Sequence, residues 1–388
     1  MWNHRVGTVL ISYKFRIYPS KTIQAKLQEQ LELCRWLYNR LLEELNKARE
    51  EGRKLKPKDT QALIVKLKQK KHNLNKVYSK VLQMVNHQLW SNIKALNELR
   101  KNGKKVGKLR YKTSPNSFKT LNFNQSGFKI DFENGKLILS KVGSIPIKLH
   151  RPIEGKIKGV IVKREKSGRW YAIVQIEDRP EPLPKTGKIV GIDVGIRHFL
   201  TDSDGRQIEN PKFYERSLNR IRILQRNLSR KQKGSKNWEK ARINLAKAYE
   251  KLVNQRNDFL HKLSRFYINN YDVIVVEDLQ IRNMVSNHNL AQRILDASWS
   301  KFIQLLSYKA ARAGRRVVRV NPKGTSKGLS MNDPYRDYIS ACRIKNRGLG
   351  RPCQPVERGP LLRTISAMEV VTGQVFSMNQ EALPLTAG

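Results

Sequence analysis

The sequence has few cysteines and no long apolar run. Its three cysteines, Cys34, Cys342 and Cys353, form no C-x-x-C pair, which excludes a disulfide framework and a four-cysteine zinc site. We therefore expect no structural zinc. No stretch reaches the roughly 18 consecutive apolar residues of a membrane-spanning helix, and the N-terminus has no signal-peptide core. These absences predict a cytoplasmic protein that does not enter a membrane.

Acidic residues are also scarce. The 388 residues include 32 Asp and Glu against 77 Lys and Arg, which gives a formal net charge of +45. Such an excess of positive charge indicates a polyanionic partner, with phosphate contacts supplying most of the affinity. Composition alone leaves a second interpretation open, in which the protein only neutralises nucleic acid, as ribosomal and chromatin proteins do.

Three of the scarce acids stand at positions that indicate metal chemistry. Asp193 lies inside the apolar segment 188–194, where a carboxylate is costly to bury unless it is paired, hydrogen-bonded or bound to a metal. Glu277 ends an apolar run of valine and isoleucine, although its neighbour Asp278 is an alternative. Asp337 is a third candidate, but it also suits the first turn of a helix. Together these carboxylates can hold two Mg²⁺ ions against a phosphodiester, which predicts a nuclease.

The first half of the chain predicts a small β-barrel with helices inserted into it. The segment 8–18 alternates apolar with polar side chains from Ile11 onward, as a half-buried strand does, and Ser20 is a suitable N-cap for the helix that follows. Short β-rich segments separated by turn residues come later, at 118–123, 128–132, 136–139, 145–149, 156–164 and 170–176. We assign 1–20 and 105–186 to the barrel domain and 21–104 to the helical domain.

The second half predicts an α/β domain. After the proline-rich linker 180–184, three strands form a meander, and helices then alternate with single buried strands. The segments are 188–194, 198–201, 206–208, 211–270, 273–276, 300–313, 315–320 and 338–346. The order three strands, helices, strand, helix, strand, helix is that of an RNase H-like fold. We assign 187–346 to this domain and predict that the tail 347–388 is largely disordered.

Several segments resemble the TnpB family of transposon-encoded RNA-guided nucleases, which is related to type V CRISPR effectors. In order along the chain they are 13–19 (YKFRIYP), 34–39 (CRWLYN), 81–83 (VLQ), 191–195 (GIDVG), 275–279 (VVEDL), 296–299 (DASW), 308–310 (YKA) and 320–322 (VNP). The resemblance implies an α/β multidomain protein with a wedge β-barrel, an inserted helical recognition domain and a RuvC nuclease domain.

The resemblance also implies a site and partners. The RuvC acids of the family fall on Asp193, Glu277 and Asp337, which would bind two Mg²⁺ ions and cut both DNA strands after a guide RNA pairs with its target. The implied partners are therefore a guide RNA and double-stranded DNA with a short adjacent motif. The protein would act as a monomer or homodimer in a prokaryotic cytoplasm, associated with the nucleoid through DNA.

Candidate nucleic-acid-binding residues come from the matched segments and from cationic stretches. They are Lys14, Arg35, Tyr38, Asn39, Lys54, Gln83, Lys104, Lys105, Arg110 and Lys112. Aromatic residues interleaved with such cations suit base stacking. In the alternative interpretation, which we favour for most of the aromatic residues, they fill the barrel core, and the charged runs are solvated faces.

The chain departs from the family in one segment. Family members usually continue from Thr-Ser into the two C-x-x-C pairs of a zinc ribbon, whereas here Thr325-Ser326 leads to Asp337 with no cysteine between them. The sequence therefore predicts a variant without the ribbon. Its retained acids favour an endonuclease, while the missing ribbon favours a guided DNA-binding protein, a repressor or inactivated remnant, that does not cut. A strand-transferring transposase is disfavoured, because no nucleophilic Tyr with a paired-His metal motif is present.

Overall fold

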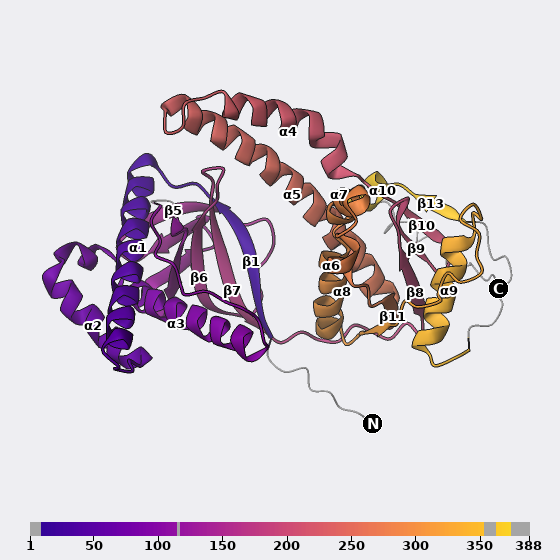
Figure 1. Cartoon of the computed structure of the whole chain (residues 1–388), viewed down its shortest axis with the longest axis horizontal. Coiled ribbons are helices and arrows are strands. Elements are labelled where there is room, and N and C mark those ends of the chain that lie inside the picture. The colour runs from indigo at the N-terminus through magenta and orange to yellow at the C-terminus, as the bar shows by residue number, and fades with distance from the viewer. Residues whose placement is uncertain (1–8, 115–116, 353–361, 374–388) are drawn as a thin grey trace. The chain divides into compact units, whose positions relative to one another are not determined.

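The computed structural model describes residues 9–114, 117–352 and 362–373 (Figure 1). The chain divides into two compact units, with the boundary between Arg179 and Pro180. The predicted boundary between barrel and nuclease domain, at 186–187, lies close to this division. No helix in the described ranges is long and apolar enough to cross a membrane.

The N-terminal unit contains a seven-stranded antiparallel sheet in the order β2-β6-β7-β1-β5-β4-β3. A three-residue 3₁₀ turn joins the two edge strands, β2 and β3, so the sheet curls into a nearly closed barrel. Inward-facing side chains alternate with exposed ones, as predicted. The strands are β1 (Val9–Ile17), β2 (Thr120–Asn124), β3 (Phe128–Asp131), β4 (Lys136–Leu139), β5 (Gly143–Lys148), β6 (Lys156–Arg164) and β7 (Trp170–Asp178).

Three helices follow β1 and precede β2 in the chain. They are α1 (Lys21–Glu50), α2 (Pro57–Lys70) and α3 (Ser79–Lys101). The hydroxyl of Ser20 accepts a hydrogen bond from the Ile23 nitrogen, so the predicted N-cap of α1 is confirmed. Helices and barrel share one hydrophobic core, to which Leu37, Leu82 and Phe123 all belong. The core therefore has no break at the predicted boundary near residue 104.

The C-terminal unit is built on a six-stranded mixed sheet in the order β12-β11-β8-β9-β10-β13. Strands β8, β11 and β12 run parallel, while β9 is antiparallel to β8 and to β10. The predicted elements occur in the predicted order, and the short helices α6 and α7, which were not predicted, precede α8. The elements are β8 (Ile189–Val194), β9 (His198–Asp202), β10 (Arg206–Glu209), α4 (Phe213–Ser229), α5 (Lys236–Asn270), β11 (Val273–Glu277), α6 (Ile281–Met284), α7 (His288–Ala297), α8 (Trp299–Ala313), β12 (Arg316–Val320) and α9 (Arg336–Gly348).

The prediction of a largely disordered tail is wrong for its described part. Strand β13 (Arg363–Ile365) pairs in parallel with β10, and helix α10 (Ala367–Thr372) begins with a capping box at Ser366. The side chain of Ile365 is only 2% exposed, because it packs into the core of the C-terminal unit. A strand this short has no periodicity to recognise and depends on the edge of β10 for its hydrogen bonds. The parts of the tail at 353–361 and 374–388 lie outside the described residues.

Helix α9 lies directly on the sheet, because two glycines leave no side chain between them. A Cβ atom at Gly191 in β8 would lie 2.1 Å from the carbonyl oxygen of Ala341 and 2.7 Å from the nitrogen of Lys345. A Cβ atom at Gly348 would lie 2.5 Å from a methyl group of Val275 in β11. These separations are far below van der Waals contact, so any larger residue would push α9 away from the sheet.

We expect Gly191→Ala to lower the free energy of unfolding of the C-terminal unit by about 1 to 3 kcal/mol, since α9 must shift to admit the methyl group. Urea denaturation measures this loss, and hydrogen exchange of β8 and α9 localises it. Gly107→Ala is the matched control, because nothing lies within 4 Å of a Cβ there. Equal protection of α9 in the two variants would show that α9 does not depend on this close approach.

Lys309 is a buried cation that joins two helices. Its side chain is 4% exposed, and its ammonium nitrogen lies 2.6 Å from the His261 carbonyl oxygen and 2.7 Å from the Ser264 hydroxyl, both in α5. Burial, and then the nearby Arg265, lower the pKa of Lys309 to about 7. The lysine of the 308–310 segment therefore fastens α8 to α5.

This pKa gives a dependence of stability on pH. An unfolded lysine keeps its proton up to about pH 10.5, whereas folded Lys309 releases it near pH 7, so the unfolded state binds more protons between these values. Stability therefore rises with pH in this window, by up to about 1.4 kcal/mol per pH unit. We expect Lys309→Met to lose this rise in urea denaturation and the exposed control Lys301→Met to keep it. Parallel pH profiles for wild type and Lys309→Met would rule out the assignment.

Candidate functional site

The three predicted acids converge at one edge of the C-terminal sheet. Asp193 is the second-to-last residue of β8, and Glu277 is the last residue of β11. Because β8 and β11 are neighbouring parallel strands, their carboxyl ends meet at the same edge. Asp337 stands in the first turn of α9, which packs on these strands. The structure thus brings together residues separated by 144 positions of sequence, from 193 to 337.

Burial and like charge both disfavour the ionised carboxylates at this edge. Burial raises the pKa of Asp193 well above its ordinary range, and Glu277 and then Asp337 raise it further, while Arg336 lowers it. Burial also raises the pKa of Glu277, although Thr325 and Arg347 partly offset this effect. In the described part of the chain, no side chain donates a hydrogen bond or forms an ion pair with the Asp193 carboxylate. A cation would relieve this repulsion directly.

Glu277 accepts a hydrogen bond from the loop that begins at Thr325-Ser326, the pair that resembles the family. The Thr325 hydroxyl donates a hydrogen bond of 2.7 Å to a Glu277 carboxylate oxygen, and Thr325 is only 3% exposed. Arg343 in α9 donates to the carbonyl oxygens of Thr325 and Lys327, at 3.1 and 2.8 Å. Arg347, one turn later, donates to the Lys323 carbonyl oxygen at 3.0 Å. The loop that leads into α9 is therefore clamped by α9 itself.

The chemistry of this site suits Mg²⁺, which prefers carboxylate oxygens. Asp193, Glu277 and Asp337 are the residues that could hold it. Yet within the ranges that the structure describes, no three His, Cys, Asp or Glu side chains are gathered tightly enough to hold a metal ion. The carboxylates are therefore electrostatic neighbours but do not form an assembled ligand shell.

Two further polar side chains near the acids were missed by the sequence analysis. Thr201 in β9 pairs directly with Asp193 in the strand register, and its hydroxyl is buried without a partner among the described residues. The Nδ1 atom of His198, at the start of β9, is likewise buried and unpaired there. Burial lowers the pKa of His198, and Asp337 opposes this shift. The register of β9 against β8 identifies Thr201, and the interaction with Asp337 identifies His198; the sequence reveals neither.

Four predicted nucleic-acid contacts lie together in the N-terminal unit, where they hold a chain segment in place. The Asn39 amide donates to the Lys112 carbonyl oxygen at 3.1 Å and accepts from the Lys112 nitrogen at 2.8 Å. Arg35 donates to the same carbonyl oxygen at 2.9 Å. The Lys112 ammonium lies 4.8 Å from the ring centre of Tyr38, which is 2% exposed. We call this group the Lys112 clasp; nucleic-acid binding by its members stays a prediction.

The other predicted contacts are more accessible. Lys14 pairs with Glu165 at 2.9 Å and lies over the Tyr171 ring. Gln83 is half-buried in α3. The remaining candidates are exposed: Lys54, Lys104, Lys105 and Arg110. Their binding also stays a prediction.

Models of known families match three parts of the chain. One described as "Probable transposase" matches residues 171–288, and one described as "Cas12f1-like, TNB domain" matches residues 299–347. These two matches contain all three acids. A third model, described as "Helix-turn-helix domain", matches residues 8–54, of which Lys21–Glu50 form one continuous helix in the structure.

Similar proteins cover most of the chain. A Streptomyces pristinaespiralis protein named "Putative RNA-guided DNA endonuclease" is 34% identical over 316 residues, which are 80% of this chain and 77% of that protein. InsQ of Escherichia coli K12, which carries the same description, is 28% identical over 82% of each chain. A solved structure is named "Cryo-EM structure of the Cas12f1-sgRNA-target DNA complex". It aligns with 90% of this chain and with 96% of its own chain, at 13% sequence identity and a TM-score of 0.49.

A protein of Acanthamoeba polyphaga mimivirus named "TnpB-like protein L79" is 24% identical over 214 residues, half of this chain and 40% of that protein. The transposase match, the extent of the Streptomyces match and the sequence motifs agree with one another. The chain belongs to the TnpB family of transposon-associated proteins.

Proposed function

We propose that this protein is an RNA-guided DNA endonuclease of an insertion-sequence transposon. One observation carries the proposal: Asp193, Glu277 and Asp337 meet at one sheet edge, where burial, and then Glu277 and Asp337, raise the pKa of Asp193. Buried carboxylates near one another are unfavourable in a folded protein, and such perturbed acids are characteristic of functional sites. The names of the related proteins support the same activity.

The proposed fold of the C-terminal unit is RNase H-like, of the RuvC type. Three antiparallel strands, β8 to β10, are extended beyond β8 by the parallel strands β11 and β12, and the acids lie at the carboxyl ends of β8 and β11. This strand order agrees with the order of elements expected from the sequence. The barrel and helices of the N-terminal unit would correspond to the wedge and recognition parts of the family.

In the proposed mechanism Asp193, Glu277 and Asp337 would hold two Mg²⁺ ions, which would supply an activated water and stabilise the leaving oxygen. The Asp193 carboxylate is available for this role because no described side chain pairs with it. Thr325 fixes the orientation of Glu277 through its hydrogen bond. Asp337 is carried on α9, so its distance from Asp193 depends on how closely α9 packs on β8.

The proposed partners are a guide RNA and double-stranded DNA. A net charge of +45 suits both. Base pairing with the guide would select the target, while the protein would read the shape of the heteroduplex and a short adjacent DNA motif. We further propose that the site works without a zinc ribbon, since three cysteines cannot form a four-cysteine site and Arg343 and Arg347 fasten the shortened loop instead.

One observation favours a second candidate function, guided DNA binding without cleavage. In the described residues the three carboxylates are not gathered closely enough to hold a metal ion. If nucleic acid does not draw them together, the protein would occupy its target as a repressor or an inactive remnant.

Plasmid cleavage separates the two functions. We expect protein co-purified with RNA from its own locus to cut a matched plasmid in Mg²⁺ but not in EDTA. Asp193→Ala, Glu277→Ala and Asp337→Ala should each slow cutting by more than about 100-fold, because each substitution removes a metal ligand.

Asp278→Ala is the matched control for this experiment, since Asp278 adjoins Glu277 but is exposed and pairs with Arg319. It should cut at nearly the wild-type rate. Guide-dependent binding with no cutting by the wild type would favour the second function, and cutting that survives Asp193→Ala would rule out the proposed site.

Thr325 should act as a positioning residue. We expect Thr325→Val to raise the Mg²⁺ concentration for half-maximal cleavage by about 10-fold or more, because Glu277 loses the hydrogen bond that orients it. Thr325→Ser keeps the hydroxyl and should restore the wild-type Mg²⁺ dependence. A change in rate without a change in Mg²⁺ dependence would show that Thr325 does not act through the metal site.

A further inference from the structure

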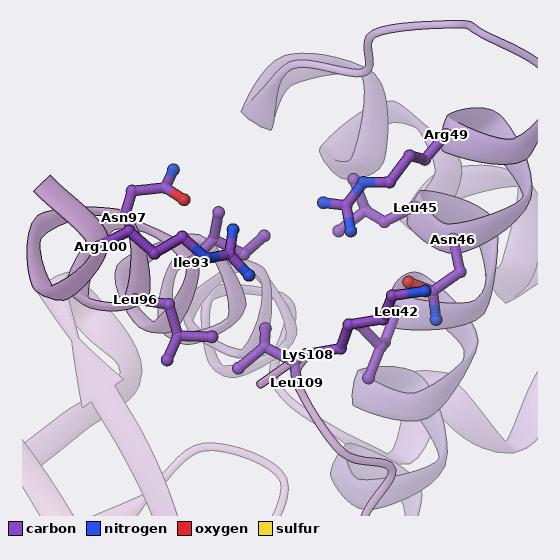
Figure 2. A pocket seen from close by; sticks show the side chains of 10 residues that line it. All are labelled: Leu42, Leu45, Asn46, Arg49, Ile93, Leu96, Asn97, Arg100, Lys108 and Leu109. Atoms are coloured by element: carbon purple, nitrogen blue, oxygen red, sulfur yellow. The ribbon is translucent and has the colours of Figure 1, made fainter. Parts of the chain in front are cut away.

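The N-terminal unit contains a cavity that the proposed nuclease chemistry does not use. It lies between α1, α3 and the segment after α3, and about 410 Å³ of empty space lies within it, part of which is open to solvent (Figure 2). Apolar side chains form its floor, among them Leu45, Ile93 and Leu96.

Three cations surround this floor. Arg49 comes from α1, Arg100 from α3 and Lys108 from the segment after α3, and Figure 2 shows the two arginines reaching toward each other across the opening. Among the described residues, no acid or hydrogen-bond acceptor pairs with any of these three side chains. Asn46 and Asn97 add amide groups to the lining.

Other cations of the same helices, which point elsewhere, do have acidic partners. Arg40 pairs with Glu43 at 2.7 Å, Lys47 with Glu43 at 3.1 Å, and Lys101 with Glu98 at 3.5 Å. These acids of α1 and α3 thus neutralise cations outside the cavity and not those around it. An anionic ligand would complete the charge balance.

The third wall of the cavity is fixed by the Lys112 clasp. Asn39 and Arg35 hold the backbone at Lys112, four residues after Lys108, and the Tyr111 hydroxyl accepts a hydrogen bond of 3.2 Å from the Asn46 amide. The segment that carries Lys108 is therefore tied to α1 at a defined place. This gives the predicted binding residues Arg35 and Asn39 an indirect part in forming the cavity.

We propose that this cavity binds one unstacked nucleotide of the bound nucleic acid, with the base on the apolar floor and its phosphate between Arg49, Arg100 and Lys108. The proposal rests on the proposed function, which supplies the nucleic acid. A base offers a flat apolar face with polar edges, which matches leucine and isoleucine beside the amides of Asn46 and Asn97. A paired, stacked base hides these surfaces, so the ligand is single-stranded.

The test measures binding of full-length protein to fluorescein-labelled oligo(U) RNA and oligo(dT) DNA by fluorescence anisotropy over a range of salt. The triple variant R49Q/R100Q/K108Q should bind about 10-fold more weakly than the control triple variant K26Q/K66Q/K94Q, which removes three exposed lysines outside the cavity. The slope of log K against log salt should fall by about 0.7 for each phosphate that the cavity variant no longer neutralises.

A second pair of variants tests the floor without changing charge. Leu96→Gln should weaken binding about 5-fold, since the base has less apolar surface to rest on, while Leu99→Gln should not, because Leu99 is 44% exposed on the same helix outside the cavity. A larger effect on RNA would assign the nucleotide to the guide, and a larger effect on DNA would assign it to the target.

Equal losses of affinity in the two triple variants, or in the two leucine variants, would overturn the proposal and leave only a general electrostatic effect. The assay needs no matched guide and no cleavage. A failure of the proposed function, seen as an absence of guided cutting, is therefore distinguishable from a failure of the nucleotide site.

Discussion

Helix α9 rests on strand β8 because position 191 has no side chain, and the geometry of the candidate site depends on this contact. The same segment that supplies Gly191 supplies Asp193 two residues later, while α9 supplies Asp337 and the arginines that fasten the loop of Thr325. Every component of the site is therefore linked to one helix–strand contact. The wide spacing of the acids in the sequence poses no difficulty, since packing and not sequence proximity brings them together.

Two buried acids in the same meander show how environment separates structural from functional carboxylates. Asp202, with no exposed surface, accepts hydrogen bonds from the Tyr267 hydroxyl at 3.0 Å and from Arg206 at 3.1 Å. Asp193 has neighbours of its own sign and no described partner. Burial raises the pKa of both; Arg206 opposes this shift at Asp202 through its charge and hydrogen bonds, whereas Arg336 opposes it at Asp193 through charge alone. Asp193 is therefore the acid that a bound cation would stabilise.

Much of the fold could be predicted, because several barrel strands alternate in polarity and the parallel strands β8 and β11 are mainly apolar. Asp193 and Glu277 could be predicted as site residues, because each is a charged residue in a mainly apolar strand. Strand β13 could not, since three residues carry no pattern and owe their structure to the edge of β10. The part that Arg35 and Asn39 play in the clasp was equally hidden, because a sequence does not show whether a polar side chain points to a ligand or to its own backbone. Thr325 belongs to the Thr-Ser pair that resembles the family. Its hydrogen bond to Glu277 could not be predicted, because it depends on a loop conformation that tertiary packing determines.

The proposed chemistry requires that Asp193, Glu277 and Asp337 act together as a metal site once nucleic acid is bound. Electron paramagnetic resonance of Mn²⁺, titrated into the protein with guide RNA and a matched target, measures this binding without relying on cleavage. We expect about two tightly bound Mn²⁺ ions per wild-type chain, as in a two-metal site, and the loss of both in Asp193→Asn. Equal Mn²⁺ binding by the wild type and Asp193→Asn would refute the metal site.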